Sequence, residues 1–157
     1  MEDIHIYTDG SALGNPGPGG YGIIIEWVGK NYTKEYSRGF RHTTNNRMEL
    51  LAIIEGLELL RKHPLEVTVF SDSKYVVEAV EKKWVFGWAS KKFKGKKNPD
   101  LWERFLLIYP KHQVRFQWIK GHNNHPQNER CDQLAVYAAK NNATTIDRGY
   151  EQSIQKK

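Results

Sequence analysis

The sequence predicts an α/β fold in which helices flank a five-stranded mixed sheet with the strand order 3-2-1-4-5. Three amino-terminal segments alternate apolar and polar residues and follow one another closely, which is typical of an antiparallel meander. Two later strand segments alternate with helical patterns, and this order requires parallel pairing through right-handed crossovers. With 39% hydrophobic and 27% charged residues, the composition is that of a globular domain rather than a disordered chain.

The first strand is expected to end at Asp9, after the alternating residues Ile4 and Ile6. Residues 10–20 contain five glycines and two prolines, and we expect them to form a loop. The other two strands of the meander are expected at residues 21–27 and 32–40.

The later elements follow from apolar spacing and from signals at their ends. Apolar residues recur at helical spacing from Asn46 to His63, and Pro64 is a stop signal. Asn98 can cap another helix, with Pro99 in its first turn. The remaining elements are a strand ending at Ser71-Asp72, a helix around Val76–Val80, a strand at 114–118 and a helix at 128–141.

We expect one domain, because 157 residues suffice for one core and no repeat or linker divides the chain. It should span residues 1–141, with a basic protrusion at about 82–98 and an unassigned polar tail at 142–157. No apolar run approaches the roughly 18 residues of a membrane span, and the acidic start does not resemble a signal peptide. The single cysteine, Cys131, is interpreted as a packing residue in a reducing compartment. These features predict a cytoplasmic monomer without membrane contact.

Four carboxylates lie at the ends of expected elements beside apolar runs: Asp9, Glu49, Asp72 and Asp132. Ligands of open sheets bind beyond the carboxyl ends of parallel strands, where Asp9 and Asp72 are expected. Neighbouring strands run about 4.7 to 4.9 Å apart, so these two carboxylates could share a hard divalent cation such as Mg²⁺. Two cations about 3.5 to 4 Å apart can activate a water against a phosphodiester. The set therefore predicts a nuclease.

Each carboxylate also has a plain structural interpretation, which the residues alone leave open. Glu49, three residues after Asn46, could be the acid of a capping box. Asp72 could be a helix N-cap, and Asp9 could form a turn with the glycine that follows it. Asp132 has the weakest structural explanation, because it lies inside an expected helix among apolar neighbours.

Residues 82–97 carry seven lysines and no acidic residue, which exceeds the net charge of +6 of the whole chain. Trp84, Trp88 and Phe93 lie between these lysines. A basic segment with flat aromatic faces suits a duplex nucleic acid, which offers both phosphates and planar surfaces. The alternative is a solvated lysine-rich loop that keeps the protein soluble.

His122 and His125 bracket the loop before the last expected helix. A histidine ordinarily titrates near pH 6.5, so one beside a metal pair could move a proton at neutral pH. The His-x-x-His spacing also occurs in zinc sites, but the chain lacks supporting cysteines. We interpret His125, which precedes a proline, as structural.

The motifs that hold these residues together resemble bacterial type 1 ribonuclease H. They are Tyr-Thr-Asp-Gly-Ser at 7–11, Gly-Asn-Pro-Gly-Pro-Gly-Gly-Tyr-Gly at 14–22, Thr-Thr-Asn-Asn-Arg-Met-Glu-Leu at 43–50, Ser-Asp-Ser-Lys-Tyr-Val at 71–76, Lys-Gly-His at 120–122 and His-Pro-Gln-Asn-Glu-Arg-Cys-Asp at 125–132. The resemblance extends over nearly the whole chain, to Gly149-Tyr150. It implies a ribonuclease H-like fold and hydrolysis of the RNA strand of an RNA/DNA hybrid, leaving 5′-phosphate and 3′-hydroxyl ends.

The resemblance also implies roles for individual residues. The metal-binding carboxylates would be Asp9, Glu49, Asp72 and Asp132, with two Mg²⁺ ions, or Mn²⁺ in their place. His122 would be a mobile catalytic histidine. The residues at the RNA strand would be Gly10, Ser11, Asn15, Asn45 and Asn46. Amide side chains suit this task, because they can both donate to and accept from a 2′-hydroxyl.

The DNA strand and its phosphates are implied to contact a second set of residues. These are His42, Thr44, Asn98, Trp84, Trp88, Lys91, Lys92, Lys94 and Lys96. Structural alternatives stay open for three of these residues. Asn98 could serve only as a helix cap, and Trp84 or Trp88 could belong to the core.

Two residues depart from the family pattern. His42 stands where arginine is frequent, unless Arg41 substitutes for it, and Lys74 stands where glutamine is common. Neither touches the carboxylate set, so activity is not put in doubt. Two competing functions are of different classes. A metal-dependent DNA nuclease on the same fold would not need the asparagines, and a hybrid-binding module without catalysis could discard the carboxylates.

Overall fold

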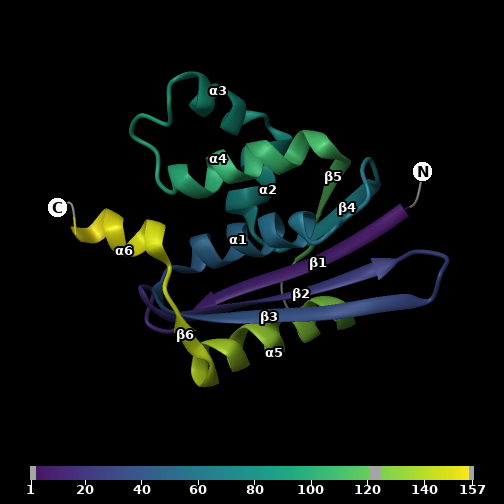
Figure 1. Cartoon of the computed structure of the whole chain (residues 1–157), viewed down its shortest axis with the longest axis horizontal. Helices are drawn as coiled ribbons and strands as arrows, with labels where there is room; N and C mark the ends of the chain where they lie inside the picture. The colour runs from purple at the N-terminus through teal and green to yellow at the C-terminus, as the bar shows by residue number, and fades with distance from the viewer. Residues whose placement is uncertain (1–2, 121–124, 156–157) are drawn as a thin grey trace.

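The structure, a computed structural model, describes residues 3–120 and 125–155. One mixed sheet lies between layers of helices (Figure 1). The strands are β1 (Asp3–Ala12), β2 (Gly17–Trp27), β3 (Tyr32–Thr43), β4 (Glu66–Ser71), β5 (Gln113–Trp118) and β6 (Ala143–Thr145). The helices are α1 (Asn45–Glu58), α2 (Lys74–Glu81), α3 (Trp84–Ser90), α4 (Pro99–Ile108), a 3₁₀ turn (Tyr109–Lys111), α5 (Pro126–Asn141) and α6 (Arg148–Gln155).

Among the described residues, the sheet has six strands in the order β5-β4-β1-β2-β3-β6. The predicted α/β fold and the order 3-2-1-4-5 are confirmed, whereas the predicted number of five strands was wrong. The additional strand, β6, pairs in parallel with β3 at Gly39 and Phe40. A strand of three residues is too short to display an alternation of apolar and polar positions, so the sequence carried no signal for it.

The predicted loop over residues 10–20 was wrong, because most of it belongs to the sheet. β1 and β2 extend into this segment from both sides, and only residues 13–16 connect them. The glycines serve close packing instead. A Cβ atom on Gly20 would lie 2.6 Å from the carbonyl oxygen of Ala135 in α5. Glycine in a strand can mark the close approach of another backbone, and here it marks the contact with a helix.

The main core lies between the sheet and the helices α1, α2 and α4, which cover one face (Figure 1). The other face is covered by α5. The residues of α1 from Arg47 to Ile54 are all buried, since this helix has the sheet on one side and α4 on another. Within the residues described, no helix is long and apolar enough to span a bilayer.

The first helix is shorter than expected at its carboxyl end. α1 ends at Glu58, whereas the apolar spacing predicted helix as far as His63. Leu60 explains the difference, because it is only 3% exposed and enters the core from the turn after the helix. Apolar spacing reports burial, and here burial continues after the helical hydrogen bonds have ended.

The segment that the sequence left unassigned contains β6 and α6. Asp147, which precedes α6, is 7% exposed. It accepts hydrogen bonds from the hydroxyl of Thr43 at 2.7 Å and from Nε of Arg47 at 2.8 Å. This buried carboxylate attaches the C-terminal segment to the end of β3 and the start of α1.

Candidate active site

Three carboxylates from three elements meet where β1 and β4 approach their carboxyl ends. The two strands pair in parallel, with Asp9 near the end of β1 and Asp72 directly after β4. Glu49 comes from α1, which packs across β1. One ligand oxygen from each of the three lies within 4.8 Å of the others. The fold therefore brings together acids that are up to 63 positions apart in the sequence.

Gly10 lets α1 come this close to β1. A Cβ atom at this position would lie 2.8 Å from Cβ of Met48 and would collide with the helix backbone. The backbone N–H of Gly10 donates to Oδ1 of Asp9 at 3.0 Å and also to Oε1 of Glu49. One backbone donor thus holds two of the carboxylates in the same place.

The capping interpretations of Glu49 and Asp72 were wrong. Thr44 is the N-cap of α1, and its hydroxyl accepts a hydrogen bond from the backbone N–H of Arg47 at 3.2 Å. Glu49 therefore lies beyond the capping-box position. Ser73 caps α2 with its hydroxyl, so Asp72 is not the cap of that helix. Both acids are directed to the carboxylate group rather than to helix ends.

Asp132 reaches the group from α5, on the other face of the sheet. Its side chain is partly exposed and shares a hydrogen bond with Asp9. Gly22, the partner of Asp9 in β2, allows this approach, because a Cβ atom there would lie 2.7 Å from Cβ of Leu134. All four predicted carboxylates therefore lie together, three of them as potential ligands of one ion.

Cys131, next to Asp132, is a packing residue. Its side chain is fully buried, and its thiol donates to the carbonyl oxygen of Tyr7 at 3.3 Å. Burial raises the pKa of this thiol far above its ordinary value, so the thiolate required of a nucleophile is disfavoured.

The carboxylate group resists ionisation. Burial raises the pKa of Asp9 to about 7; a hydrogen bond with Glu49 lowers it, and the charges of Asp72 and Asp132 raise it. Burial also raises the pKa of Glu49 well above its ordinary value, and the charge of Asp9 acts in the same direction. Neighbouring carboxylates repel one another when they are ionised, and a cation bound among them removes this repulsion. A set of oxygen ligands fits a hard divalent cation such as Mg²⁺ or Mn²⁺.

Amide side chains lie beside the carboxylates and connect α1 to the turn between β1 and β2. Oδ1 of Asn45 accepts from the backbone N–H of Ala12 at 2.5 Å. The backbone N–H of Asn45 donates to Oδ1 of Asn15 at 2.9 Å. Asn46, the next residue, is exposed. Asn45 and Asn46 thus lie about one helical turn before Glu49 in α1, and Asn15 is bonded to Asn45.

The sequence model of the RNase H family matches residues 1–140. The chain belongs to the RNase H family. It is 53% identical over 152 residues to the Ribonuclease H of Desulforamulus reducens, an alignment that covers 94% of each chain. It is 51% identical over 153 residues to the Ribonuclease HI of Shewanella oneidensis, again with 94% of each chain covered.

Solved structures of RNase H proteins share the fold. LC9-RNase H1, described as a type 1 RNase H with the type 2 active-site motif, has a TM-score of 0.80 at 32% identity, covering 89% of this chain and 73% of that one. LC11-RNase H1, solved in complex with an RNA/DNA hybrid, has a TM-score of 0.63 at 30% identity, covering 87% of this chain and 96% of that one.

In this RNase H, Asn98 does not serve as a helix cap through its side chain. It adopts a left-handed conformation with φ of 62° at the start of α4 and makes no side-chain cap bond. Its Oδ1 instead accepts from Nη1 of Arg47 at 3.3 Å. Because Arg47 also donates its backbone N–H to Thr44, the two predicted phosphate-pocket residues are joined through one arginine.

Arg47 is the residue that the sequence analysis missed. Its side chain is 3% exposed, and it forms paired hydrogen bonds with the carboxylates of Asp100 and Asp147 as well as the bond to Asn98. These bonds use all five N–H groups of the guanidinium. The available signal was an arginine within the buried first turns of a helix, but its acidic partners Asp100 and Asp147 are 53 and 100 residues away in the sequence.

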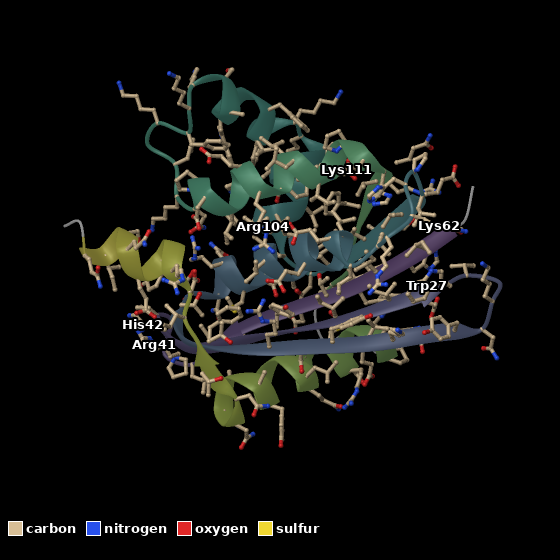
Figure 2. All side chains as sticks on the ribbon, in the orientation of Figure 1. Trp27, Arg41, His42, Lys62, Arg104 and Lys111 are labelled. Atoms are coloured by element: carbon tan, nitrogen blue, oxygen red, sulfur yellow. The ribbon has the colours of Figure 1, made fainter. Side chains whose placement is uncertain are left out.

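His42 and Arg41, the two candidates for the position where arginine is frequent in the family, both contact the C-terminal segment. His42 packs against the ring of Tyr150, with centroids 5.3 Å apart. Arg41 forms two hydrogen bonds with Glu151, at 2.7 and 2.8 Å, and is engaged with α6. Both residues lie at the end of the sheet beside the C-terminal segment (Figure 2).

The basic protrusion consists of α3 and the loop that follows. Phe93 anchors this loop and is 6% exposed. Trp88 packs edge-on against Trp102 of α4, with ring centroids 5.9 Å apart. The part of Trp88 that contacts Trp102 therefore belongs to the core. Trp84 is 46% exposed and is not a core residue. The lysines of the loop are all exposed: Lys91, Lys92, Lys94, Lys96 and Lys97.

Of the loop histidines His122 and His125, only His125 lies within the described part of the chain. His125 is the N-cap of α5, and its Nδ1 accepts from the backbone N–H of Asn128 at 3.4 Å. This bond agrees with its structural interpretation. His122, the predicted catalytic histidine, lies outside the described residues.

Proposed function

We propose that this chain is an endoribonuclease that hydrolyses the RNA strand of RNA/DNA hybrids and leaves 5′-phosphate and 3′-hydroxyl ends. The observation that carries this proposal is the group of Asp9, Glu49 and Asp72, whose ligand oxygens lie within 4.8 Å of one another. Membership of the RNase H family supports the reaction. The hybrid bound to its relative LC11-RNase H1 supports the substrate.

The cofactor proposed for the acidic group is Mg²⁺, with Mn²⁺ as an alternative. Asp9 and Asp72 would hold two ions between them, with Glu49 and Asp132 on either side. When bound, such ions supply Lewis acidity for a water nucleophile and for the departing 3′-oxygen. The raised pKa values of Asp9 and Glu49 support this assignment, because an adjacent cation favours the ionised carboxylates that the group resists on its own.

The two strands of the hybrid are recognised by different chemistry. The RNA strand is assigned to Gly10, Ser11, Asn15, Asn45 and Asn46, whose amides and hydroxyl can bond to 2′-hydroxyl groups. The DNA strand is assigned to the phosphate pocket at Thr44, Asn98 and His42 and to the basic protrusion. In the protrusion, Trp84 offers an exposed flat face to a deoxyribose, and the lysines neutralise phosphates. His122 is assigned to proton transfer.

Cleavage of matched substrates tests the proposal. Hybrid, double-stranded RNA and double-stranded DNA are incubated with the protein in Mg²⁺ or in chelator. We expect loss of the RNA strand of the hybrid alone, and only with metal. Cleavage of the DNA duplex would favour a DNA nuclease on the same fold, and binding without cleavage would favour a non-catalytic hybrid-binding module.

Two carboxylate variants link the activity to the site. Asp9→Asn and Asp72→Asn should lower the cleavage rate below detection while hybrid binding remains, because each removes an ionised ligand and little else. Glu103→Gln is the matched control, since Glu103 is an exposed residue of α4. Undiminished turnover in either aspartate variant would reject the assignment.

We also infer a monomer located in the cytoplasm, folded as one unit. A molar mass near 18.3 kDa by light scattering would support the monomer, and twice that mass would contradict it.

A further inference from the structure

Trp118, the last residue of β5, lies beside the turn that carries Asp72. β5 pairs in parallel with β4 at one edge of the sheet, and the register sets Trp118 opposite Ser71, the last residue of β4. Nε1 of the Trp118 indole donates a hydrogen bond to the backbone carbonyl oxygen of Asp72 at 3.2 Å. An indole N–H can only donate, so the direction of this bond is fixed. A side chain of the edge strand thus contacts the backbone of one of the clustered carboxylates.

The peptide group between Asp72 and Ser73 is hydrogen-bonded at both of its ends. Its carbonyl oxygen accepts from Trp118, and its N–H donates to Oγ of Ser71 at 3.1 Å. The peptide group before Asp72 is bonded as well, because the carbonyl oxygen of Ser71 accepts from the backbone N–H of Ile119 at 2.9 Å. Peptide groups are planar, so a residue turns only about φ and ψ, which relate the planes on its two sides. With both planes bonded, the direction in which the Asp72 side chain leaves the backbone is fixed.

Lys74, in the first turn of α2, keeps the Trp118 ring in place. Its Nζ atom lies over the indole, 5.0 Å from the ring centroid. A cation in this position is attracted by the negative face of the ring. The indole is 38% exposed, so it has room to turn toward solvent if nothing contacts its face. Trp118 is therefore fixed by a hydrogen bond at its edge and by a cation on its face.

The direction of a carboxylate matters when several must meet one ion. Ligand oxygens of Asp9, Glu49 and Asp72 lie within 4.8 Å of one another. Asp9 and Glu49 share the backbone N–H of Gly10 as a donor, whereas the turn at Asp72 is bonded to the end of β5. Mg²⁺ demands near-ideal octahedral geometry, with oxygen distances of about 2.0 to 2.1 Å. A small rotation of the Asp72 backbone would therefore weaken the binding of the ion.

We propose that Trp118 is a positioning residue for the metal site, which fixes the Asp72 carboxylate through the bond of its indole N–H to the Asp72 carbonyl oxygen. The inference rests on the proposed function, which assigns a divalent cation to Asp72. Hydrogen-bond partners that orient metal ligands typically change metal affinity by about 10- to 100-fold when they are removed. Because Trp118 acts through the backbone rather than on the carboxylate itself, we expect the lower end of this range.

Trp118→Phe tests the proposal, because it removes the indole N–H and keeps an aromatic ring beside Lys74. Mg²⁺ binding is measured without hybrid, by NMR titration of the backbone amides. The dissociation constant for Mg²⁺ should rise about tenfold relative to the wild type. In cleavage assays, the Mg²⁺ concentration that gives half of the maximal rate should rise by a similar factor. At saturating Mg²⁺, KM for the hybrid should change by less than about twofold, because no contact with the substrate is removed.

Two more variants separate positioning from poor folding. Ser71→Ala removes the acceptor at the other end of the same peptide group, so it should also weaken Mg²⁺ binding, and it tests the turn even if Trp118→Phe does not fold. Trp27→Phe is the matched control. Trp27 pairs with Ile4 at the amino end of β1, whereas the carboxylates lie at the carboxyl end of that strand (Figure 2). This variant should keep the wild-type dissociation constant for Mg²⁺ and the wild-type cleavage rate.

The outcomes distinguish this inference from the proposed function. An unchanged dissociation constant for Mg²⁺ in folded Trp118→Phe, or in Ser71→Ala if Trp118→Phe does not fold, would reject the positioning role. A rise in KM for the hybrid with unchanged Mg²⁺ binding would also reject it, since the indole would then act on the substrate. If the wild type binds Mg²⁺ but cleaves no hybrid, the proposed function is rejected, and the titrations still decide the role of Trp118. A wild type that binds no Mg²⁺ would reject both.

Discussion

At Asp9, the requirements of folding and of metal binding oppose each other. Burial and the charges of Asp72 and Asp132 favour the protonated acid, and its pKa rises to about 7. Metal binding needs the ionised form. An acid whose pKa is higher in the folded protein than in the unfolded chain destabilises the fold as pH rises. This loss of stability begins as the pH passes the unfolded-state pKa of about 4 and is complete above the folded-state pKa.

Asp9→Asn should therefore stabilise the metal-free protein at pH 8. The expected gain in free energy of unfolding is roughly 2 to 4 kcal/mol, from a pKa difference of about three units at about 1.4 kcal/mol each. The gain should shrink as pH falls from 8 toward 4, because the wild-type carboxyl becomes protonated and neutral.

Urea unfolding in chelator at pH 5 and pH 8 measures this effect, with Glu103→Gln as the control. Added Mg²⁺ should then stabilise the wild type more than Asp9→Asn. An equal difference between the two proteins at both pH values would contradict the assignment of a strained, buried acid.

Among the elements, β1, β4 and α1 could be predicted from local patterns, and their order placed Asp9 and Asp72 at neighbouring strand ends. The structure of the glycine-rich segment at residues 10–20 could not be predicted in this way. Its glycines predicted a loop because a single sequence does not reveal that a helix lies against the strand. Gly22, in the adjoining segment that was predicted as a strand, makes the same kind of contact: a Cβ atom there would lie 2.4 Å from the carbonyl oxygen of Cys131 in α5. The same contact sets the distance between Asp132 and the other carboxylates.

Gly22→Ala should therefore disturb both stability and the site. Overpacking against a helix backbone typically costs about 1 to 3 kcal/mol, and we expect the upper part of this range because backbone atoms cannot rotate away. The cleavage rate in Mg²⁺ should fall as well, since α5 carries Asp132.

Gly87→Ala is the matched control for this substitution. Gly87 lies in α3, and a Cβ atom there would have no neighbour within 4 Å. Alanine should add up to about 1 kcal/mol of stability there through its helix propensity. Denaturant unfolding compares the two variants, and the initial cleavage rate of Gly22→Ala is compared with that of the wild type; a Gly22→Ala protein as stable and as active as the wild type would mean that α5 can move without consequence.

For the whole molecule, the sequence predicted the carboxylate group and the basic segment, because both are clusters of residue type at recognisable positions. It did not predict the buried network of Arg47, Asp100 and Asp147, which joins α1, α4 and the C-terminal segment. Such a network depends on pairings across the chain that leave no periodic pattern. The C-terminal segment was unassigned for the same reason, although Asp147 is among the most buried charged residues described.

The basic protrusion should determine how hybrid binding depends on salt, since each phosphate neutralised contributes a slope of about 0.9 in log affinity against log salt. Replacing Lys91, Lys92, Lys94 and Lys96 together with alanine should weaken binding at low salt. It should also reduce the slope by up to about 0.9 for each lysine that contacts a phosphate. Fluorescence anisotropy of a labelled hybrid over a series of salt concentrations measures both effects.

Four lysines at the opposite end of the sheet provide a control variant with the same change in net charge. Lys30 lies in the turn between β2 and β3, and Lys34 lies in the first residues of β3, where β2 pairs with the amino end of β1. Lys62 and Lys111 precede β4 and β5 at the same end of the sheet (Figure 2). Their joint replacement lowers the net charge by the same amount but should leave the slope nearly unchanged, because these lysines are far from the carboxyl ends where the hybrid is proposed to bind. Equal losses of slope in both quadruple variants would mean that net charge, rather than the protrusion, attracts the hybrid.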